Sequence, residues 1–335
     1  MSASAFFQAV DGKVSNEVLD LISSEVARVE QELVRQVGSQ IGTVELVGQS
    51  TLKAGGKRLR PAILGIAARA TGRPFDSERA IRLGACMEMI HMATLIHDDV
   101  IDQSPLRRGQ PTAHTQVGAT PAILAGDVLL AKAMVLLAED GDLQVIRTVS
   151  QMVVEMAEGE VRELEVRNQF DLSEREHMEV LRMKTAAFIE CCCLVGAMIA
   201  TDDATTIQAL RDYGAEIGLA FQIVDDLLDY RSNDTGKPKA GDFREGQATL
   251  PLILLRKSLN NEEYAFAQRH FGTEINSDDL TLLTGWMRDR GAFDEAESRA
   301  ERHVEIALAA LERLPNSESR TLLESVSGLV LSRSR

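Results

Sequence analysis

Two short acidic motifs carry the residue types and the spacing that could do chemistry. The first is HDDVID, in which Asp98 and Asp102 lie four positions apart with Asp99 between them. The apolar run before the motif predicts a buried helix, and residues four apart share one face of a helix, so the two carboxylates project together. Unpaired buried charge is costly, and clusters of carboxylate oxygens suit hard cations such as magnesium. The motif therefore predicts a magnesium site at the end of a buried helix.

A second motif repeats this pattern later in the chain. It is FQIVDDLLDY, with Asp225, Asp226 and Asp229, and it also ends an apolar helical run and precedes a polar loop that carries basic residues. We expect the two helices to face each other and to form a pocket with carboxylates on opposing walls, in which divalent metal bridges a diphosphate. One such motif alone would fit a solvated acidic helix end equally well, but two copies argue against that alternative.

A basic glycine loop, LKAGGKRLRP, precedes the first motif. Gly55 and Gly56 allow close approach of the backbone, and Lys57, Arg58 and Arg60 converge where a helix begins. Cations and free backbone N–H groups at a helix start favour an anion as ligand. The alternative is a solvated basic loop without a ligand.

Further lysines could reach the same kind of ligand. Lys184 begins the apolar half of a helix and would reach from its rim, although a surface lysine is an equally good interpretation. Lys237 and Lys239 lie in a long loop between Arg231 and Ile253, a length typical of functional lids, and could close over a bound anion.

The composition indicates one helical domain. The 335 residues are 44% hydrophobic and only 4% aromatic, which suits an all-α fold with a substantial core, and no linker divides residues 1–335. Helical periodicity predicts segments at about 16–47, 75–101, 120–138, 144–167, 173–200, 205–230 and 292–314. Gly126 lies inside one of them, where glycine is unfavourable unless close packing requires it.

Charge and cysteine usage narrow the partners and the compartment. A formal charge of −15 argues against a nucleic-acid-binding surface, because phosphate backbones require a basic footprint. Cys86 and Cys191, Cys192 and Cys193 lie in apolar runs without zinc-ligand spacing, so we expect reduced core thiols in a cytoplasmic protein. The longest apolar stretch, 186–200, is too short for a transmembrane segment and contains a glutamate.

With these motifs in place, the sequence resembles the trans-isoprenyl diphosphate synthases, and most closely their long-chain polyprenyl members. The strings that carry the resemblance are, in order, GGKRLRP, EMIHMATLIHDDVID, LRRG, MKTAAFIE, FQIVDDLLDY, GKP and the terminal LSRSR. Each string alone is weak, but their order and spacing together make chance agreement very improbable.

The resemblance implies an isoprenoid-synthase-type helical bundle around a deep central cavity, usually as a homodimer. It implies a Mg²⁺-dependent prenyltransferase that condenses isopentenyl diphosphate with an allylic prenyl diphosphate. Asp98, Asp102, Asp225 and Asp229 would bind the metal, and Asp99 and Asp226 adjoin them. The positions that match contacts to the allylic diphosphate are Arg107, Lys184, Thr185, Gln222 and Lys237, and those that match the isopentenyl diphosphate site are Lys57, Arg60, His91 and Arg108.

The resemblance also bears on product length, and the sequence departs from the family pattern at two positions. Ala93 and Thr94 stand where aromatic side chains stop elongation early in this family, so we expect a long product. Ala240 stands where glycine is usual, and Gln247 stands where the family generally has a diphosphate-binding lysine. The alternatives are a shorter-chain farnesyl or geranylgeranyl diphosphate synthase, a regulatory subunit of a heteromeric synthase, and a terpene cyclase. Regulatory subunits commonly lack the aspartates, and cyclases lack the paired motifs and the isopentenyl diphosphate site.

Overall fold

The structure is a computed structural model that describes residues 12, 14–56, 58–231 and 240–332. These residues form an all-α fold, as expected, and their sheet content is one pair of two-residue strands. The first elements are α2 (Asn16–Val37), α3 (Gly42–Lys53), α4 (Leu59–Ala70), α5 (Ser77–Ile101), β1 (Leu106–Arg107), β2 (Gln110–Pro111), α6 (Ala113–Val117), α7 (Ala119–Asp140) and α8 (Leu143–Val166). They are followed by α9 (Glu174–Leu181), the π-helix η1 (Arg182–Ala186), α10 (Ala187–Met198), α11 (Ala204–Arg231), α12 (Gly241–Arg244), α13 (Leu250–Arg256), α14 (Asn261–His270), α15 (Ser277–Asp289), α16 (Ala292–Leu311) and α17 (Glu318–Ser332).

The chain divides into two compact units, each assembled from separate stretches of sequence. The first unit contains Met1–Gln151, Cys191–Leu210 and Arg313–Ser325. The second contains Met152–Glu190, Arg211–Glu312 and Val326–Arg335. The two aspartate motifs lie in different units, so each motif is described within its own unit.

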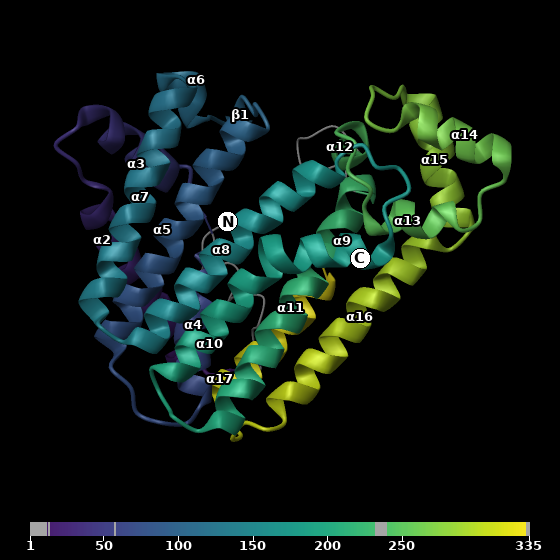
Figure 1. Cartoon of the computed structure of the whole chain (residues 1–335). Helices are drawn as coiled ribbons and strands as arrows, with labels where there is room; N and C mark the ends of the chain where they lie inside the picture. The colour runs from purple at the N-terminus through teal and green to yellow at the C-terminus, as the bar shows by residue number, and fades with distance from the viewer. Residues whose placement is uncertain (1–11, 13, 57, 232–239, 333–335) are drawn as a thin grey trace. The chain divides into compact units, whose positions relative to one another are not determined.

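Helix α5 is the central helix of the first unit. It is apolar on almost every side, and it packs against α2, α4 and α7, which lie in the same part of Figure 1. A helix that is hydrophobic all round must be covered on all sides to be stable, which explains why three long helices enclose it. Its N-terminus is fixed by Asp76, whose side chain accepts a hydrogen bond from the Glu78 N–H at 2.9 Å. The first aspartate motif forms its C-terminal end.

Helix α7 packs against α5 through small residues. A Cβ on Gly126 would lie 2.4 Å from Nε2 of His97 on α5, so glycine is required here for close packing, as the sequence suggested. The His97 ring nitrogen lies 3.2 Å from the Ile123 carbonyl oxygen and 3.4 Å from the Asp127 carboxylate. His97 therefore joins the two helices.

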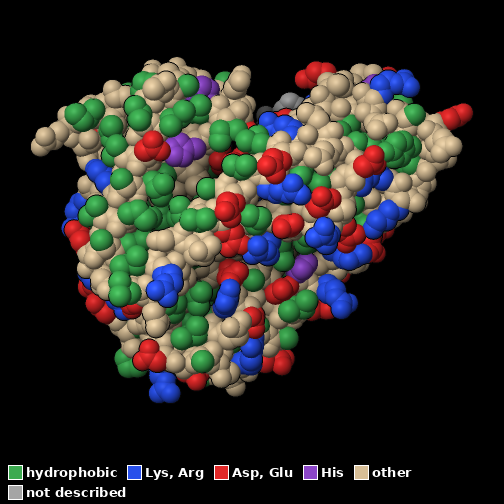
Figure 2. All heavy atoms as spheres, viewed as in Figure 1, with side chains coloured by type: hydrophobic (Ala, Val, Ile, Leu, Met, Phe, Trp, Pro, Cys, Tyr) green, Lys and Arg blue, Asp and Glu red, His purple; other side chains and the backbone are tan. Residues whose placement is uncertain are grey.

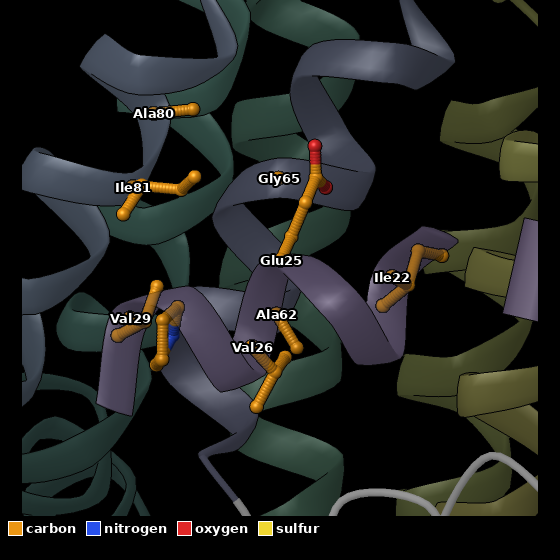
Figure 3. Close-up of a pocket in the computed structure, with 9 residues that line it drawn as sticks. Ile22, Glu25, Val26, Val29, Ala62, Gly65, Ala80 and Ile81 are labelled. Atoms are coloured by element: carbon orange, nitrogen blue, oxygen red, sulfur yellow. The ribbon is translucent and has the colours of Figure 1, made fainter. Parts of the chain in front are cut away.

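A small hollow lies at the other end of the first unit. It is lined by side chains from α2, α4 and α5, among them Val26, Ala62 and Ile81 (Figure 3). Ile81 and Asp98 are separated by 17 residues of α5, or roughly 25 Å at 1.5 Å per residue. The hollow is therefore separate from the first aspartate motif.

The second unit is organised around α11, α13 and α16. Residues 250–255 of α13 are all buried, and this helix packs against α16, α15 and α9 (Figure 1). Phe271 lies edge-on to Phe170 and Phe243, with ring centroids 5.4 and 5.5 Å away, so the segment that follows α12 is fixed by aromatic packing. The second aspartate motif lies near the C-terminal end of α11.

The structure corrects two details of the sequence prediction and refines a third. The single helix expected over 16–47 is two helices, because the chain leaves the helical conformation at Gly38, whose ψ is 139°. The helix expected over 173–200 contains the π-helical turn η1. The loop expected over 231–253 contains the short helix α12, while residues 232–239, including Lys237 and Lys239, lie outside the described residues.

The expectation for the cysteines is confirmed. All four are free and buried, and burial raises the pKa of the Cys86 and Cys192 thiols to about 12. A thiol with so high a pKa stays protonated at neutral pH, which makes it a poor nucleophile and a poor metal ligand. These cysteines are core residues.

Gly159 on α8 provides a test of the packing in the second unit. A Cβ at this position would lie 2.8 Å from the Met183 Cβ and 2.9 Å from the Lys184 backbone nitrogen. Because backbone cannot yield as a side-chain tip can, we predict that Gly159→Ala lowers the free energy of unfolding by about 1–3 kcal/mol. Chemical unfolding of the purified protein measures this difference.

The control is Gly285→Ala on α15, where nothing lies within 4 Å of the added Cβ. Helix propensity alone should make that variant more stable by about 0.5–1 kcal/mol. Equal stability of the two variants would show that η1 does not pack closely against α8.

Candidate functional site

The first aspartate motif presents two carboxylates on one face, as its spacing predicts. Asp102 caps the C-terminus of α5, and its N–H donates to the Asp98 carbonyl oxygen at 2.8 Å, so helical geometry extends across the whole motif. Asp98 is half-buried and Asp102 is exposed. The C-terminal end of a helix carries partial negative charge, which disfavours carboxylates and increases the benefit of a bound cation.

The middle aspartate of this motif has a different environment. Asp99 is buried, and its Oδ1 accepts a hydrogen bond from Arg107 Nε at 2.7 Å. Burial raises the pKa of the Asp99 carboxyl, although the adjacent Arg107 opposes that shift. Asp99 therefore anchors the hairpin that follows α5.

That hairpin directs two consecutive arginines, Arg107 and Arg108, toward different neighbours. Strands β1 and β2 pair Leu106 with Pro111 and Arg107 with Gln110, and the two residues between the strands, Arg108 and Gly109, both have positive φ. Positive φ at both central positions is typical of the tightest hairpin turns. Arg107 is thus directed to Asp99, while the guanidinium of Arg108 lies 3.2 Å from the position of a Cβ on Gly56.

The glycine loop brings the other predicted cations to this place. Arg58 is buried, so the alternative of a solvated basic loop was wrong for this residue, and it adopts a left-handed conformation with φ 47° before α4. Its Nη1 donates to Oε1 of the buried Glu88 at 2.8 Å. Arg60 follows in the first turn of α4, whereas Lys57 lies outside the described residues.

The pKa of His91 reflects its burial and the positive charges around it. Its pKa is lowered well below the ordinary histidine value, first by burial and then by the positive charges of Arg60, Arg108, Arg107 and Arg58. Both burial and nearby positive charges disfavour the protonated imidazole. The structure therefore brings Arg60, His91 and Arg108 together within the first unit, with His91 held neutral at neutral pH.

The second aspartate motif follows the same plan. Asp226 is buried and accepts hydrogen bonds from His177 Nε2 at 2.8 Å and from the Leu250 N–H at 3.2 Å. Its neighbours Asp225 and Asp229 are half-buried and lie one helical turn apart. The middle aspartate again fixes surrounding elements, here α9 and α13.

Asp229 stands in a region of concentrated negative charge. It accepts hydrogen bonds from the N–H groups of Gly241 at 3.0 Å and Asp242 at 3.2 Å. Its pKa is nevertheless raised, first by burial and also by the charges of Asp226 and Glu245. Burial and the charge of Asp229 likewise raise the pKa of the Asp242 carboxyl. A raised carboxylate pKa indicates that a cation would be favoured here.

Lys184 is not a surface lysine. It lies in η1, and its Nζ is 2.9 Å from Oε2 of Glu160 and also pairs with Glu163, both on α8. Burial lowers its pKa, but the two carboxylates outweigh that effect, so the pKa is raised and the side chain stays charged. Thr185 is the next residue of η1 and is half-buried.

Three other residues of the prediction can be placed. Gln222 lies on α11, three residues before Asp225 and therefore on the same side of the helix. Ala93 is fully buried in α5, and the Thr94 hydroxyl donates to the His91 carbonyl oxygen at 2.9 Å.

The two departures from the family pattern lie beside Asp229. Ala240 is buried with φ 54°, a left-handed conformation that glycine adopts more easily, which explains why glycine is usual at this position. The Gln247 N–H donates to the Asp242 carbonyl oxygen at 2.8 Å. Gln247 thus lies in the same segment as the acidic cluster.

Sequence reasoning missed the partners of the predicted residues. These are Glu88, Glu160, Glu163, His177 and Asp242. Spacing gave a signal for one set only, because Glu160 and Glu163 are three apart on a helix and share a face. The others are separated from their partners by tens of residues in most cases, and one sequence contains no sign of such contacts.

Across the described part of the chain, no three histidine, cysteine or acidic side chains are grouped to hold a metal ion by themselves. Each motif instead offers a pair of carboxylates. Magnesium is commonly bound by one or two carboxylates together with substrate phosphates and water, so the donor set fits this ion when a diphosphate supplies the remaining oxygens.

Comparisons with known proteins agree on one family. The family model described as polyprenyl synthetase matches residues 43–281. An all-trans-nonaprenyl-diphosphate synthase (geranyl-diphosphate specific) from Rhodobacter capsulatus is 36% identical over 97% of this chain and 99% of its own length.

Solved structures give the same result. A decaprenyl diphosphate synthase from Rhodobacter capsulatus has a TM-score of 0.90 and 33% identity, over 96% of this chain and 99% of that one. A polyprenyl synthase from Caulobacter crescentus, complexed with calcium and isoprenyl diphosphate, has a TM-score of 0.87 and 34% identity, over 96% of this chain and 99% of that one.

Proposed function

The chain belongs to the polyprenyl synthetase family, and we propose from that membership that it builds a long all-trans polyprenyl diphosphate by repeated condensation. It is a prenyltransferase that joins isopentenyl diphosphate to an allylic diphosphate. The observation that carries the proposal is the presence of two complete aspartate motifs, each at the end of a helix, in a chain similar over nearly its whole length to long-chain synthases.

The isopentenyl diphosphate site is proposed to lie in the first unit, at the glycine loop. Lys57, Arg60 and Arg108 would bind the diphosphate, with forked guanidinium contacts from the arginines and a point charge from the lysine. His91 would donate one hydrogen bond as a neutral imidazole. The convergence of Arg60, His91 and Arg108 in the structure supports this assignment.

The allylic diphosphate is assigned to the aspartate motifs and to a second group of residues. The proposed ligands of its oxygens are Arg107, Lys184, Thr185, Gln222 and Lys237. Lys184 supports this assignment because Glu160 and Glu163 keep it charged and directed. With Gln247 in place of a lysine, these residues would carry more of the binding.

The metal ligands are proposed to be Asp98, Asp102, Asp225 and Asp229, and magnesium is the ion that best suits their oxygens. The bound ions would supply positive charge that neutralises the diphosphate leaving group. Asp99 and Asp226 act differently in this proposal. Asp99 positions the hairpin through Arg107, and Asp226 positions α9 through His177 and α13 through the Leu250 N–H.

The protein residues then account for the reaction as follows. Lys184 and Arg107 stabilise the charge that develops on the diphosphate when its carbon–oxygen bond breaks, and the apolar side chains of α5 exclude water from the allylic cation. Arg60, His91 and Arg108 hold isopentenyl diphosphate so that its double bond attacks that cation. The lost proton passes to the released diphosphate, and the product is an allylic diphosphate five carbons longer.

We further propose that two copies assemble through α7. Among the described residues, α7 is the one helix long and apolar enough to cross a membrane by length and composition. Its inner side covers α5, while Ile123, Leu124 and Val135 remain exposed, and hydrophobic side chains gather over this helix in Figure 2. A second copy would cover the exposed apolar face of α7, and its own α7 would be covered in the same contact, since a twofold interface is self-complementary. The packing against α5 favours this over membrane insertion, and we propose a cytoplasmic enzyme.

The test uses the purified chain alone, with light scattering to establish whether it is a dimer. Incubation with magnesium, isopentenyl diphosphate and one allylic primer at a time, followed by mass spectrometry, should give products that grow in five-carbon steps. Asp98→Asn should reduce turnover by at least about a hundredfold, because a metal ligand is lost. Absence of isopentenyl diphosphate consumption by the wild-type chain would favour a cyclase or a regulatory subunit instead.

Product length is tested at Ala93, which lies five residues before Asp98, or roughly 7.5 Å along the helix. We propose that the growing chain extends along α5 past this position. Ala93→Phe should then shift the products to fewer carbons, whereas Ala93→Ser, the matched control, should leave the distribution unchanged. An unaltered distribution in a folded Ala93→Phe variant would contradict the assignment of Ala93 and Thr94.

A further inference from the structure

Glu88 is a buried carboxylate at the centre of an arginine cluster. It lies on α5 with 3% of its surface exposed, one helical turn before His91. Its Oε1 accepts a hydrogen bond from Arg58 Nη1 at 2.8 Å, and Arg58 is only 5% exposed. Removing one partner of a buried ion pair leaves the other charge uncompensated, so the two residues depend on each other.

Arg58 is used within the protein and not for a ligand. Besides Glu88, its Nη2 donates to the Leu52 carbonyl oxygen at 3.1 Å, and its Nε lies 3.4 Å from Oε1 of Glu30. These contacts join α2, the end of α3 and α5 to the residue that precedes α4. Arg58 therefore fixes the position of the glycine loop. It does so in a left-handed conformation that costs about 1–2 kcal/mol for a residue with a side chain.

Glu88 also acts on the two arginines assigned to isopentenyl diphosphate. Burial lowers the pKa of Arg60 and of Arg108, and the charge of Glu88 opposes that shift in both. The position of a Cβ on Gly56 lies 3.1 Å from Arg58 Nη1, 3.2 Å from Arg108 Nη1 and 3.7 Å from Glu88 Oε1. Groups from three segments of the chain thus converge on one glycine.

Without a carboxylate at this place, several guanidinium groups would face one another at short range. Their mutual repulsion would push Arg108 and Arg60 apart, because like charges in a partly buried site are weakly screened. An internal anion removes that repulsion and still leaves net positive charge for a diphosphate. Glu88 is suited to this purpose because α5 holds it rigidly.

We propose that Glu88 is a positioning residue of the isopentenyl diphosphate site: through Arg58 and through its own charge, it sets the spacing of Arg60 and Arg108. This inference rests on the proposed function, which assigns those two arginines to the substrate. It adds a residue that makes no contact with the substrate but determines how tightly one of the two substrates binds.

The proposal predicts that a change at Glu88 affects the KM for isopentenyl diphosphate but not the KM for the allylic primer. Glu88→Gln keeps the size of the side chain and removes its charge, so it should raise the KM for isopentenyl diphosphate roughly tenfold, as expected for the loss of a charge-assisted contact. The KM for the allylic primer and kcat should remain within about twofold. An unchanged KM for isopentenyl diphosphate would overturn the proposal, and so would a lower KM, which would mean that Glu88 only repels the substrate.

A matched control is available on α2. Glu32 is also a buried glutamate of the first unit, 6% exposed, and its hydrogen-bond partners are Arg35 and Gln36 on its own helix. Glu32→Gln should leave both Michaelis constants unchanged. Equal shifts in both constants for both variants would indicate general loss of structure and would refute a specific role for Glu88.

A double-mutant cycle tests the route through Arg58. Arg58→Met should also raise the KM for isopentenyl diphosphate, and Glu88→Gln with Arg58→Met should be no worse than the more harmful single change. If the increases in KM of the two single variants multiplied in the double variant, the two residues would act independently, and the action through Arg58 would be refuted. If Glu88→Gln weakens the fold, Glu88→Leu with Arg58→Met replaces the pair by apolar side chains, which often retains stability, and it must still raise this KM.

The outcome is distinguishable from failure of the proposed function. If the wild-type chain consumed no isopentenyl diphosphate, there would be no Michaelis constant to compare and the proposed function itself would fall. If the wild-type chain is active and Glu88→Gln behaves as wild type, only the role of Glu88 is wrong.

Discussion

The structure depends on compensating negative charge at the C-terminal ends of two helices. Helices α5 and α11 both end in an aspartate motif, where the helix dipole already disfavours carboxylates. The raised pKa values of Asp99, Asp229 and Asp242 show that burial and mutual repulsion act on these acids. Cations are favoured at such a site, because positive charge offsets both the burial and the mutual repulsion of the carboxylates.

Some charged pairs around the motifs hold elements of the fold together, and others involve the basic residues near the proposed substrate sites. The middle aspartates are paired within the protein, with Arg107 in one unit and His177 in the other. Conversely, three glutamates pair with cations: the buried Glu88 with Arg58, and the half-buried Glu160 and Glu163 with Lys184. The same logic of opposite charges therefore governs both the acidic motifs and the basic residues proposed to bind diphosphate.

The sequence was informative wherever spacing determines geometry. The helical repeat placed Asp98 with Asp102 and Asp225 with Asp229, and the glycine inside α7 correctly indicated close packing, here against His97. Local breaks were harder to predict, because Gly38 ends α2 while the apolar pattern continues beyond it. The π-helical turn was not predictable either, since it extends a helix without changing which residue types are favoured.

Contacts between distant segments could not be predicted from one sequence. His177 reaches Asp226 across 49 positions and Arg58 reaches Glu88 across 30, and neither residue type nor local pattern marks these pairs. Family resemblance supplied the residues expected to touch substrate. It did not supply their internal partners, which only the folded chain reveals.

The central claim, that the aspartate motifs bind a prenyl diphosphate through divalent cations, is tested most directly by calorimetry. Geranyl diphosphate would be titrated into the protein without isopentenyl diphosphate, once with magnesium and once with a chelator. The account predicts that the chelator weakens binding by roughly a hundredfold, and that Asp98→Asn with Asp225→Asn removes this difference. Equal affinity with and without magnesium in the wild-type chain would contradict it.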